Sequence, residues 1–161
     1  LGGNAKVLVF SMFTSSLAVL EKALDVEEIT SVSMIGSTSV AERLSYMEKF
    51  KESKDLNVML LHYKVGGEGL NLTEATHVFP LEPWWTHAVH NQGIFRSWRR
   101  GQTLPVTVHW VLTDKTIESN ILRMCENKQC MADSYLYGTE MPDPKSTGLS
   151  KFELRALLYG R

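Results

Sequence analysis

The sequence predicts an α/β fold, an open and mostly parallel sheet with helices on both faces. Short runs of apolar and β-branched residues alternate with segments whose apolar residues recur at helical spacing, and the connections between them are only a few residues long. Residues 57–61 (NVMLL) are almost continuously apolar, which is typical of a strand buried on both faces of a parallel sheet. In such sheets the working loops follow the carboxyl ends of the strands.

The first half of the chain contains two strand–helix units. Residues 6–10 (KVLVF) predict a strand, and Thr14 is a candidate N-cap for a following helix whose leucines recur at helical spacing. Residues 31–35 predict a second strand, and Ser39 with Glu42 forms an S-x-x-E capping box ahead of a second helix.

The second half continues the alternation after the strand at 57–61. Further strands are predicted at 77–81 and 106–112, with a helix over 87–99 between them. Another helix is predicted over 116–124, extending toward residue 131.

One domain is expected over residues 1–137, followed by a linker rich in Pro, Gly and Ser and a short terminal helix over 138–161. The chain begins with Leu1, so we expect it to be a piece of a longer protein. It contains neither a run of eighteen apolar residues nor a signal-peptide pattern, and we expect a soluble, intracellular protein without membrane partners.

Charge is unevenly distributed along the chain. The formal net charge of -1 gives no overall attraction to nucleic acid, so any DNA contact must come from local clusters. Residues 21–28 and 48–55 are rich in acids, whereas Arg96, Arg99 and Arg100 fall close together without an intervening acid.

The cysteines and histidines do not predict a metal site. Cys125 and Cys130 are spaced unlike a zinc motif or a disulfide framework, and we expect free thiols. His87 and His90 lie three apart, but no Cys or carboxylate stands close in sequence to complete a set of ligands.

A glycine-rich loop over 64–72 (KVGGEGLNL) directly follows the buried strand. Glycines permit positive φ and let backbone N–H groups approach an anion, although a plain turn is the alternative. No GxxxxGK[ST] phosphate loop is present, so the chain alone is not expected to hydrolyse ATP.

Two arginines and three tryptophans lie near one another in the sequence after this loop. On a helix, Arg96 and Arg99 would project from one face and suit a γ-phosphate, while a solvated basic patch is the alternative. Trp84, Trp85 and Trp98 suit stacking on a base or an adenine ring, with core packing the favoured alternative.

The order of these pieces resembles the second, C-terminal lobe of SWI/SNF-type, superfamily-two helicase-like ATPases. The resemblance runs from residue 6 to about 125 and rests on the segments KVLVFSMFTS, IGSTSVAER, MLLHYKVGGEGLNLTEATHVFPLEPWW and NQGIFRSWRRGQTLPVTVHWVLTDKTIESNIL. It implies a RecA-like lobe, and the tail most resembles the transcription-termination branch.

The resemblance also implies roles for individual residues. In that family two lobes close over ATP with Mg²⁺, and the first lobe supplies the phosphate loop and the Mg²⁺ ligands. Here Arg99 would be the principal arginine finger and Arg96 its partner, and the remaining nucleotide-side residues would be Gly67, Gly69, Gln92 and Gln102. Contacts to the DNA backbone would come from Thr14, Ser15, Ser37, Thr38, Lys64, Gly66, Asn71 and Trp85.

The implied function is one half of an ATP-dependent double-stranded DNA translocase in the nucleus, of the chromatin-remodelling or transcription-termination type. The expected partners are duplex DNA, the first lobe of the parent chain, and a nucleosome or RNA polymerase. A dinucleotide-binding enzyme is discounted, because the glycine loop lacks the GxGxxG spacing.

Several positions depart from the family pattern. The segment before the glycines reads His62-Tyr63 where Ser-Thr is common. The pattern DQA-x-DR-x-(H/Y)R has Asn91 for the first Asp, Gly93 for Ala, Phe95 for the second Asp and Trp98 for His or Tyr, while Arg96 and Arg99 are kept. The loss of a carboxylate beside the arginines favours an alternative function, a degenerate and ATPase-inactive lobe kept as a DNA- or protein-binding scaffold.

Overall fold

The computed structural model describes residues 5–66, 69–113 and 116–138, which form five strands and five helices. The strands are β1 (Lys6–Ser11), β2 (Ser31–Met34), β3 (Val58–His62), β4 (Ala75–Pro80) and β5 (Thr107–Val108). The helices are α1 (Thr14–Val26), α2 (Val40–Glu52), α3 (Tyr63–Gly66), α4 (His87–Ile94) and α5 (Ile117–Tyr137).

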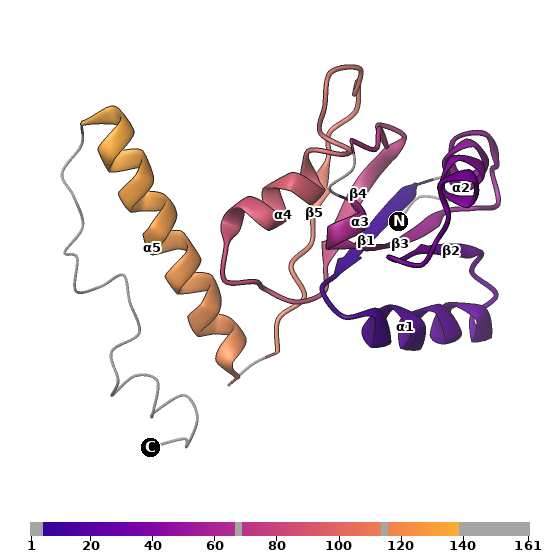
Figure 1. The fold of residues 1–161 in the computed structure, drawn as a ribbon, viewed down its shortest axis with the longest axis horizontal. Coiled ribbons are helices and arrows are strands. Elements are labelled where there is room, and N and C mark those ends of the chain that lie inside the picture. Colours follow the sequence, from indigo (N-terminus) through magenta and orange to yellow (C-terminus); the bar gives the residue numbers. More distant parts are fainter. Residues whose placement is uncertain (1–4, 67–68, 114–115, 139–161) are drawn as a thin grey trace. The chain divides into compact units, whose positions relative to one another are not determined.

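The strands form one sheet in the order β2-β3-β1-β4-β5, and every neighbouring pair is parallel (Figure 1). The predicted α/β fold class is therefore confirmed. Because the strands run in one direction, the loops that follow β1, β2, β3 and β4 leave the sheet at the same edge.

Both faces of the sheet are covered, because the side chains of β1 alternate between two core clusters. Leu8 and Phe10 pack in a cluster that includes Phe50 of α2 and residues of α3 and α4. Val7 and Val9 pack in a second cluster with the leucines of α1. Helices α2 and α4 thus cover one face, and α1 covers the other.

Local signals placed some element ends correctly and others wrongly. The capping box is confirmed, since the amide of Ser39 donates to the Glu42 carboxylate at 2.8 Å and the Ser39 hydroxyl accepts from the Glu42 amide at 3.3 Å. Thr14 was expected to be an N-cap, but Phe13 holds that position and Thr14 is the first helical residue. The strand expected over 106–112 is only two residues long, because the chain turns off the sheet where Trp110 packs edge-on against His90.

The chain divides into two compact units, Leu1–Glu82 with Val89–Val111 and Pro83–Ala88 with Leu112–Arg161. The first contains the sheet. In the second, the buried thiol of Cys125 donates to the carbonyl of Trp84 at 2.9 Å, and burial raises the pKa of this thiol. Cys125 and the exposed Cys130 are free thiols, as predicted.

The predicted linker and terminal helix lie almost wholly outside the described residues, and the domain boundary at residue 138 stays a prediction. Among the described helices, none has the length and apolar character needed to span a membrane.

We predict that acid destabilises the β4–β5 edge through a histidine pair. Nδ1 of His77 lies 2.9 Å from Nε2 of His109, a bond that needs one neutral acceptor ring. Burial and the neighbouring His109 lower the pKa of His77, so the folded state favours its neutral form. The free energy of unfolding should therefore be constant above the unfolded pKa, about 6.5, and fall as the pH drops below it.

Thermal unfolding of the chain at pH 7.5 and pH 5.5 measures this effect. In the variant His77→Gln the difference in Tm between the two pH values should be smaller than in the wild type. An unchanged difference would show that other groups carry the pH dependence.

Candidate nucleotide and nucleic-acid interface

The carboxyl ends of three neighbouring strands are held together by polar contacts. The Ser11 hydroxyl donates to the Glu82 carboxylate at 2.8 Å, and the amide of Met12 donates to the same carboxylate. Nε2 of His62 donates to the carbonyl of Met12 at 2.9 Å, while its Nδ1 accepts from the amide of Lys64 at 3.2 Å. The ends of β1 and β3 and the residues after β4 therefore form one fixed edge.

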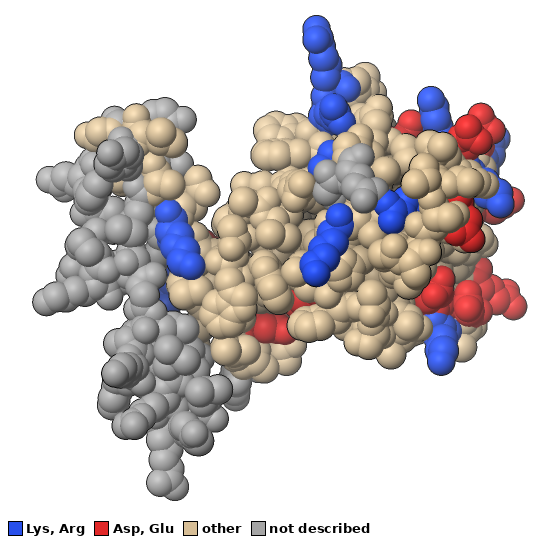
Figure 2. Space-filling view, viewed as in Figure 1, with Lys and Arg blue, Asp and Glu red and all other residues tan. Residues whose placement is uncertain are grey.

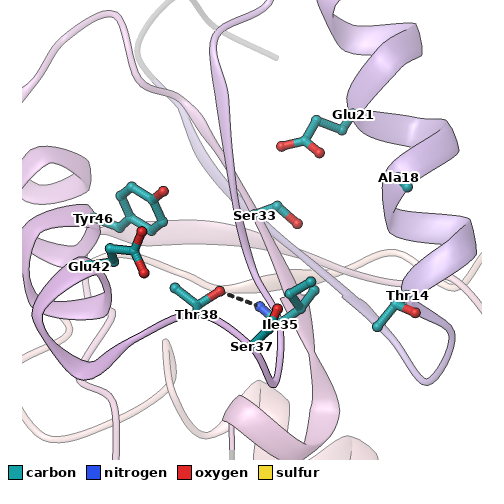
Figure 3. A pocket seen from close by; sticks show the side chains of 9 residues that line it. All are labelled: Thr14, Ala18, Glu21, Ser33, Ile35, Ser37, Thr38, Glu42 and Tyr46. Carbon is teal, nitrogen blue, oxygen red and sulfur yellow. Dashed lines mark hydrogen bonds between the residues drawn. The ribbon is translucent and has the colours of Figure 1, made fainter.

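Three of the predicted DNA-contacting hydroxyl residues meet in a hollow of about 270 Å³ between α1, β2 and α2 (Figure 3). They are Thr14, Ser37 and Thr38, and the Thr38 hydroxyl also accepts from the amide of Ile35 at 3.0 Å. The carboxylates of Glu21 and Glu42 line the same hollow. Because these acids repel anions, the interior of the hollow does not suit a phosphate group.

Ser15, the fourth predicted hydroxyl contact, is not part of this hollow. It lines a separate groove of about 430 Å³, whose other lining residues are Ser16, Val19, Leu20, Ala23 and Leu81. Ser15 therefore lines a different hollow from its sequence neighbour Thr14.

The glycine-rich loop begins at α3 and ends beside the arginines. Lys64 and Asn71 are exposed along it, and Gly69 has a φ of 76°, a conformation that favours glycine. At its exit the amide of Leu72 donates to the carbonyl of Arg96 at 3.0 Å. Gly66 ends α3, and Gly67 lies outside the described residues.

The arginines lie in turns after α4 and not on the helix that was expected to reach residue 99. The helix ends at Ile94, because the amides of Arg96 and Ser97 donate to the carbonyls of Gly93 and Ile94, three residues back instead of four, at 3.1 Å each. The buried hydroxyl of Ser97 also donates to the Ile94 carbonyl, at 3.0 Å. Arg96 is half-buried and Arg99 is exposed. Burial, and to a smaller extent the charge of Arg99, lower the pKa of Arg96. We call residues 95–102 the arginine turn.

The arginine turn lies next to the amino end of β4, whereas the hydroxyl residues lie at the carboxyl ends of β1 and β2. Gln102 fixes this position, because its Nε2 donates to the carbonyls of Thr73 at 2.7 Å and Ala75 at 3.1 Å. Its Oε1 accepts from the amide of Leu104 at 2.9 Å. The structure thus gives Gln102 a positioning role, and its predicted contact with nucleotide stays a prediction.

The variant Gln102→Ala should lose roughly 1–3 kcal/mol of unfolding free energy, because backbone groups of Thr73, Ala75 and Leu104 lose their partner. Urea denaturation measures this loss. The matched control is Gln92→Ala, because Gln92 is an exposed residue of α4 and its replacement should change stability by less than about 0.5 kcal/mol. Equal losses of unfolding free energy in the two variants would contradict the positioning role of Gln102.

Two of the tryptophans are exposed, so core packing is wrong for them. Trp98 is 63% exposed and Phe95 is 47% exposed, and their ring centroids lie 5.7 Å apart. With Arg99 and Arg100 they line an open hollow of about 540 Å³, which also includes Gln102, Thr103, Leu104 and Pro105. Trp85 is exposed as well, but it belongs to the other unit, as does half-buried Trp84.

Charge on the drawn face agrees with the division seen in the sequence (Figure 2). Acidic side chains gather on the right of the view, where α1 and α2 lie in Figure 1. The lining of the arginine hollow contains two arginines and no acid. In the part of the chain that the structure describes, no three His, Cys, Asp or Glu side chains are grouped to hold a metal ion.

Sequence reasoning missed two contacts that shape this region. One is the hydrogen bond from the Ser11 hydroxyl to the carboxylate of Glu82, 71 residues away. The other is the hydrogen bond between the Tyr63 hydroxyl and Nδ1 of His90, 27 residues away. Only the departure of Tyr63 from the family pattern hinted at the second.

Residues 2–101 match the family model of the helicase conserved C-terminal domain. The chain belongs to this family. A solved structure, the C-terminal part of the Fun30 ATPase domain, matches with a TM-score of 0.71 and 35% identity over 73% of this chain and 38% of that one. The predicted RecA-like second lobe of a SWI/SNF-type protein is thereby confirmed.

Two relatives show how much of a longer protein such a lobe represents. The helicase lobe is 45% identical over 157 residues to putative helicase 172L of Invertebrate iridescent virus 6, covering 95% of this chain and 26% of the relative. It is 38% identical over 123 residues to DNA repair protein rad8 of Schizosaccharomyces pombe, covering 76% of this chain and 11% of the relative. The chain therefore spans about a quarter or less of these relatives.

Proposed function

We propose that this chain is the C-terminal lobe of an ATP-dependent double-stranded DNA translocase, active only together with a first lobe of its parent protein. Arg99 would stabilise the charge that builds up on the γ-phosphate, with Arg96 beside it. The observation that carries this proposal is the bond between the amide of Leu72 and the carbonyl of Arg96, which ties the glycine-rich loop to the arginine turn. A movement of the backbone in either loop would therefore be transmitted to the other loop.

The arginine turn fits an anionic group such as the triphosphate of ATP. The guanidinium group of Arg99 is exposed beside Arg100 in a hollow whose lining contains no acid. The Mg²⁺ that accompanies ATP, and the phosphate cradle, would belong to the first lobe. Gly67, Gly69 and Gln92 are the remaining residues that we propose near the nucleotide.

Duplex DNA would lie across the carboxyl edge of the sheet. Lys64 is exposed just after β3, and the exposed Ser37 lines the acidic hollow. Asn71 is exposed at the other end of the glycine-rich loop, beside the arginine turn. Such groups hold phosphates without reading base sequence, which suits movement along DNA. We further propose that the parent protein acts in the nucleus, on chromatin or on transcription complexes, and contacts a nucleosome or RNA polymerase. Membership of the transcription-termination branch is the most specific of these predictions.

A second candidate function is a binding scaffold without turnover. The exposed rings of Phe95 and Trp98 favour it, because they replace a carboxylate and a polar ring of the family pattern beside the arginines.

ATP hydrolysis by the parent protein with both lobes, measured with and without duplex DNA, distinguishes the two functions. A translocase should hydrolyse ATP faster when DNA is present and should displace the third strand of a DNA triplex. DNA binding without hydrolysis above background, in a parent whose first lobe has an intact phosphate loop, would establish the scaffold.

A further inference from the structure

Two departures from the family pattern, Tyr63 and Gly93, touch one another in the core. A Cβ atom built on buried Gly93 would lie 3.1 Å from Cε1 of Tyr63 and 3.4 Å from the ring of Phe10. At 3.1 Å the ring would have to move. The family pattern has Thr at position 63 and Ala at position 93. In this chain the large ring at position 63 occupies space that the methyl group of an alanine at position 93 would need.

The Tyr63 ring is held from several sides and has little room to move. It stacks on Phe10 with ring centroids 5.2 Å apart, and its hydroxyl lies 2.7 Å from Nδ1 of His90. Burial raises the pKa of Tyr63, so the hydroxyl keeps its proton and shares a hydrogen bond with Nδ1 of His90. His90 is only 1% exposed and is itself fixed edge-on against Trp110 at 4.8 Å.

These contacts join the two loops of the proposed site. Tyr63 is the first residue of α3, which leads into the glycine-rich loop, while His90 and Gly93 belong to α4, which leads into the arginine turn. The bond between Leu72 and Arg96 joins the far end of the glycine-rich loop to the start of the arginine turn. The glycine-rich loop is therefore connected at both ends to α4 or to the residues that directly follow it.

We infer that Tyr63, His90 and Gly93 form a co-adapted linkage in which Tyr63 and His90 are positioning residues for the finger arginines. This inference rests on the proposed translocase function. The linkage consists of a large ring, a matching gap and a hydrogen bond at positions where the family pattern has threonine and alanine. Decay of an unused site would leave cavities or unmatched polar groups, whereas these three residues fit one another.

The co-adaptation is tested by unfolding, independently of activity. In the wild-type chain, Gly93→Ala should lower Tm, because its methyl group meets the fixed ring. In the background Tyr63→Thr, the same change should leave Tm unchanged or raise it, because alanine favours the helix more than glycine does. A similar fall in Tm in both backgrounds would overturn the linkage between the two positions.

The positioning role is tested with Tyr63→Phe in the parent protein, because this variant keeps the ring and removes only the bond to His90. We expect a fall in DNA-stimulated kcat of roughly threefold to tenfold with an unchanged KM for ATP. The double variant Tyr63→Thr with Gly93→Ala, which restores the family pattern, should retain more activity than Gly93→Ala alone. The control for lost stability is Val58→Ala, in the core cluster on the other face of the sheet, which should keep its kcat.

The outcomes separate this inference from the proposed function. If Tyr63→Phe keeps its full kcat while Arg99→Ala is inactive, the positioning role is overturned and the translocase function stands. If Val58→Ala loses as much kcat as Tyr63→Phe, the effect is general destabilisation and the positioning role is again overturned. If the wild-type parent does not hydrolyse ATP, both the positioning role and the translocase function fail, and the unfolding experiment alone decides the packing.

Discussion

Replacing Arg99 with alanine in the two-lobe parent is expected to lower DNA-stimulated kcat by roughly three to five powers of ten. The physical reason is that a finger arginine meets negative charge that develops only in the transition state, so its loss affects turnover more than binding. Steady-state ATP hydrolysis at saturating duplex DNA measures the effect. Both kcat and kcat/KM should fall by similar factors, and the KM for ATP should change little.

The matched control is Arg100→Ala. Arg100 follows Arg99 directly, is exposed like it, lines the same hollow and has the same charge. It is not one of the two arginines that we propose to meet the γ-phosphate, so we expect its loss to lower kcat by less than tenfold. Equal and small losses in the two variants would show that the arginine turn is a general basic patch and would contradict the finger mechanism.

Replacing Phe10 with alanine is expected to cost about 3–5 kcal/mol of unfolding free energy. Phe10 has no exposed surface, lies in the core cluster under α2 and α4, and stacks on Tyr63. Its removal would leave a cavity beneath both Tyr63 and Gly93, whose surroundings are too fixed to collapse into it. Urea denaturation of the chain, analysed as a two-state transition, measures the loss.

Phe13→Ala provides the comparison for this variant. Phe13 lies three residues further along the chain but is 52% exposed at the start of α1, so its loss should cost less than about 1 kcal/mol. If the two variants lost similar stability, local sequence effects and not burial would explain the result.

The parts of the fold that depend on short-range patterns were predictable from the sequence. The continuous apolar run near β3 reflects burial on both faces, and the capping box at Ser39 needs only residues three apart. The ends of α4 and β5 were not predictable in this way. The end of β5 lies beside the packing of Trp110 against His90, a tertiary contact without a local pattern. The end of α4 depends on backbone bonds to the third residue back, which no sequence motif marks.

The candidate site, too, was predictable in part from the sequence and in part only from the structure. Motif order pointed to the glycine-rich loop and the arginine turn, but it placed Arg96 and Arg99 on a helix that ends before them. The connection between the loops is made by Tyr63 and His90, which are 27 residues apart and could be paired only in three dimensions. The carboxylates beside Thr14 in the hollow were likewise unforeseen, because they come from two different helices.

The fit of Tyr63 against Gly93 also constrains the order in which these residues can have arisen. A glycine in α4 beside a small residue at position 63 costs only about 1 kcal/mol relative to alanine, so that intermediate would remain folded. A tyrosine introduced while alanine still occupied position 93 would meet the 3.1 Å contact with a ring that has little room to move. From a starting sequence with threonine at 63 and alanine at 93, as in the family pattern, the accessible path therefore opens the gap first and fills it afterwards. Among natural sequences of this lobe, glycine at position 93 with a small residue at 63 should occur, and tyrosine at 63 with alanine at 93 should be rare.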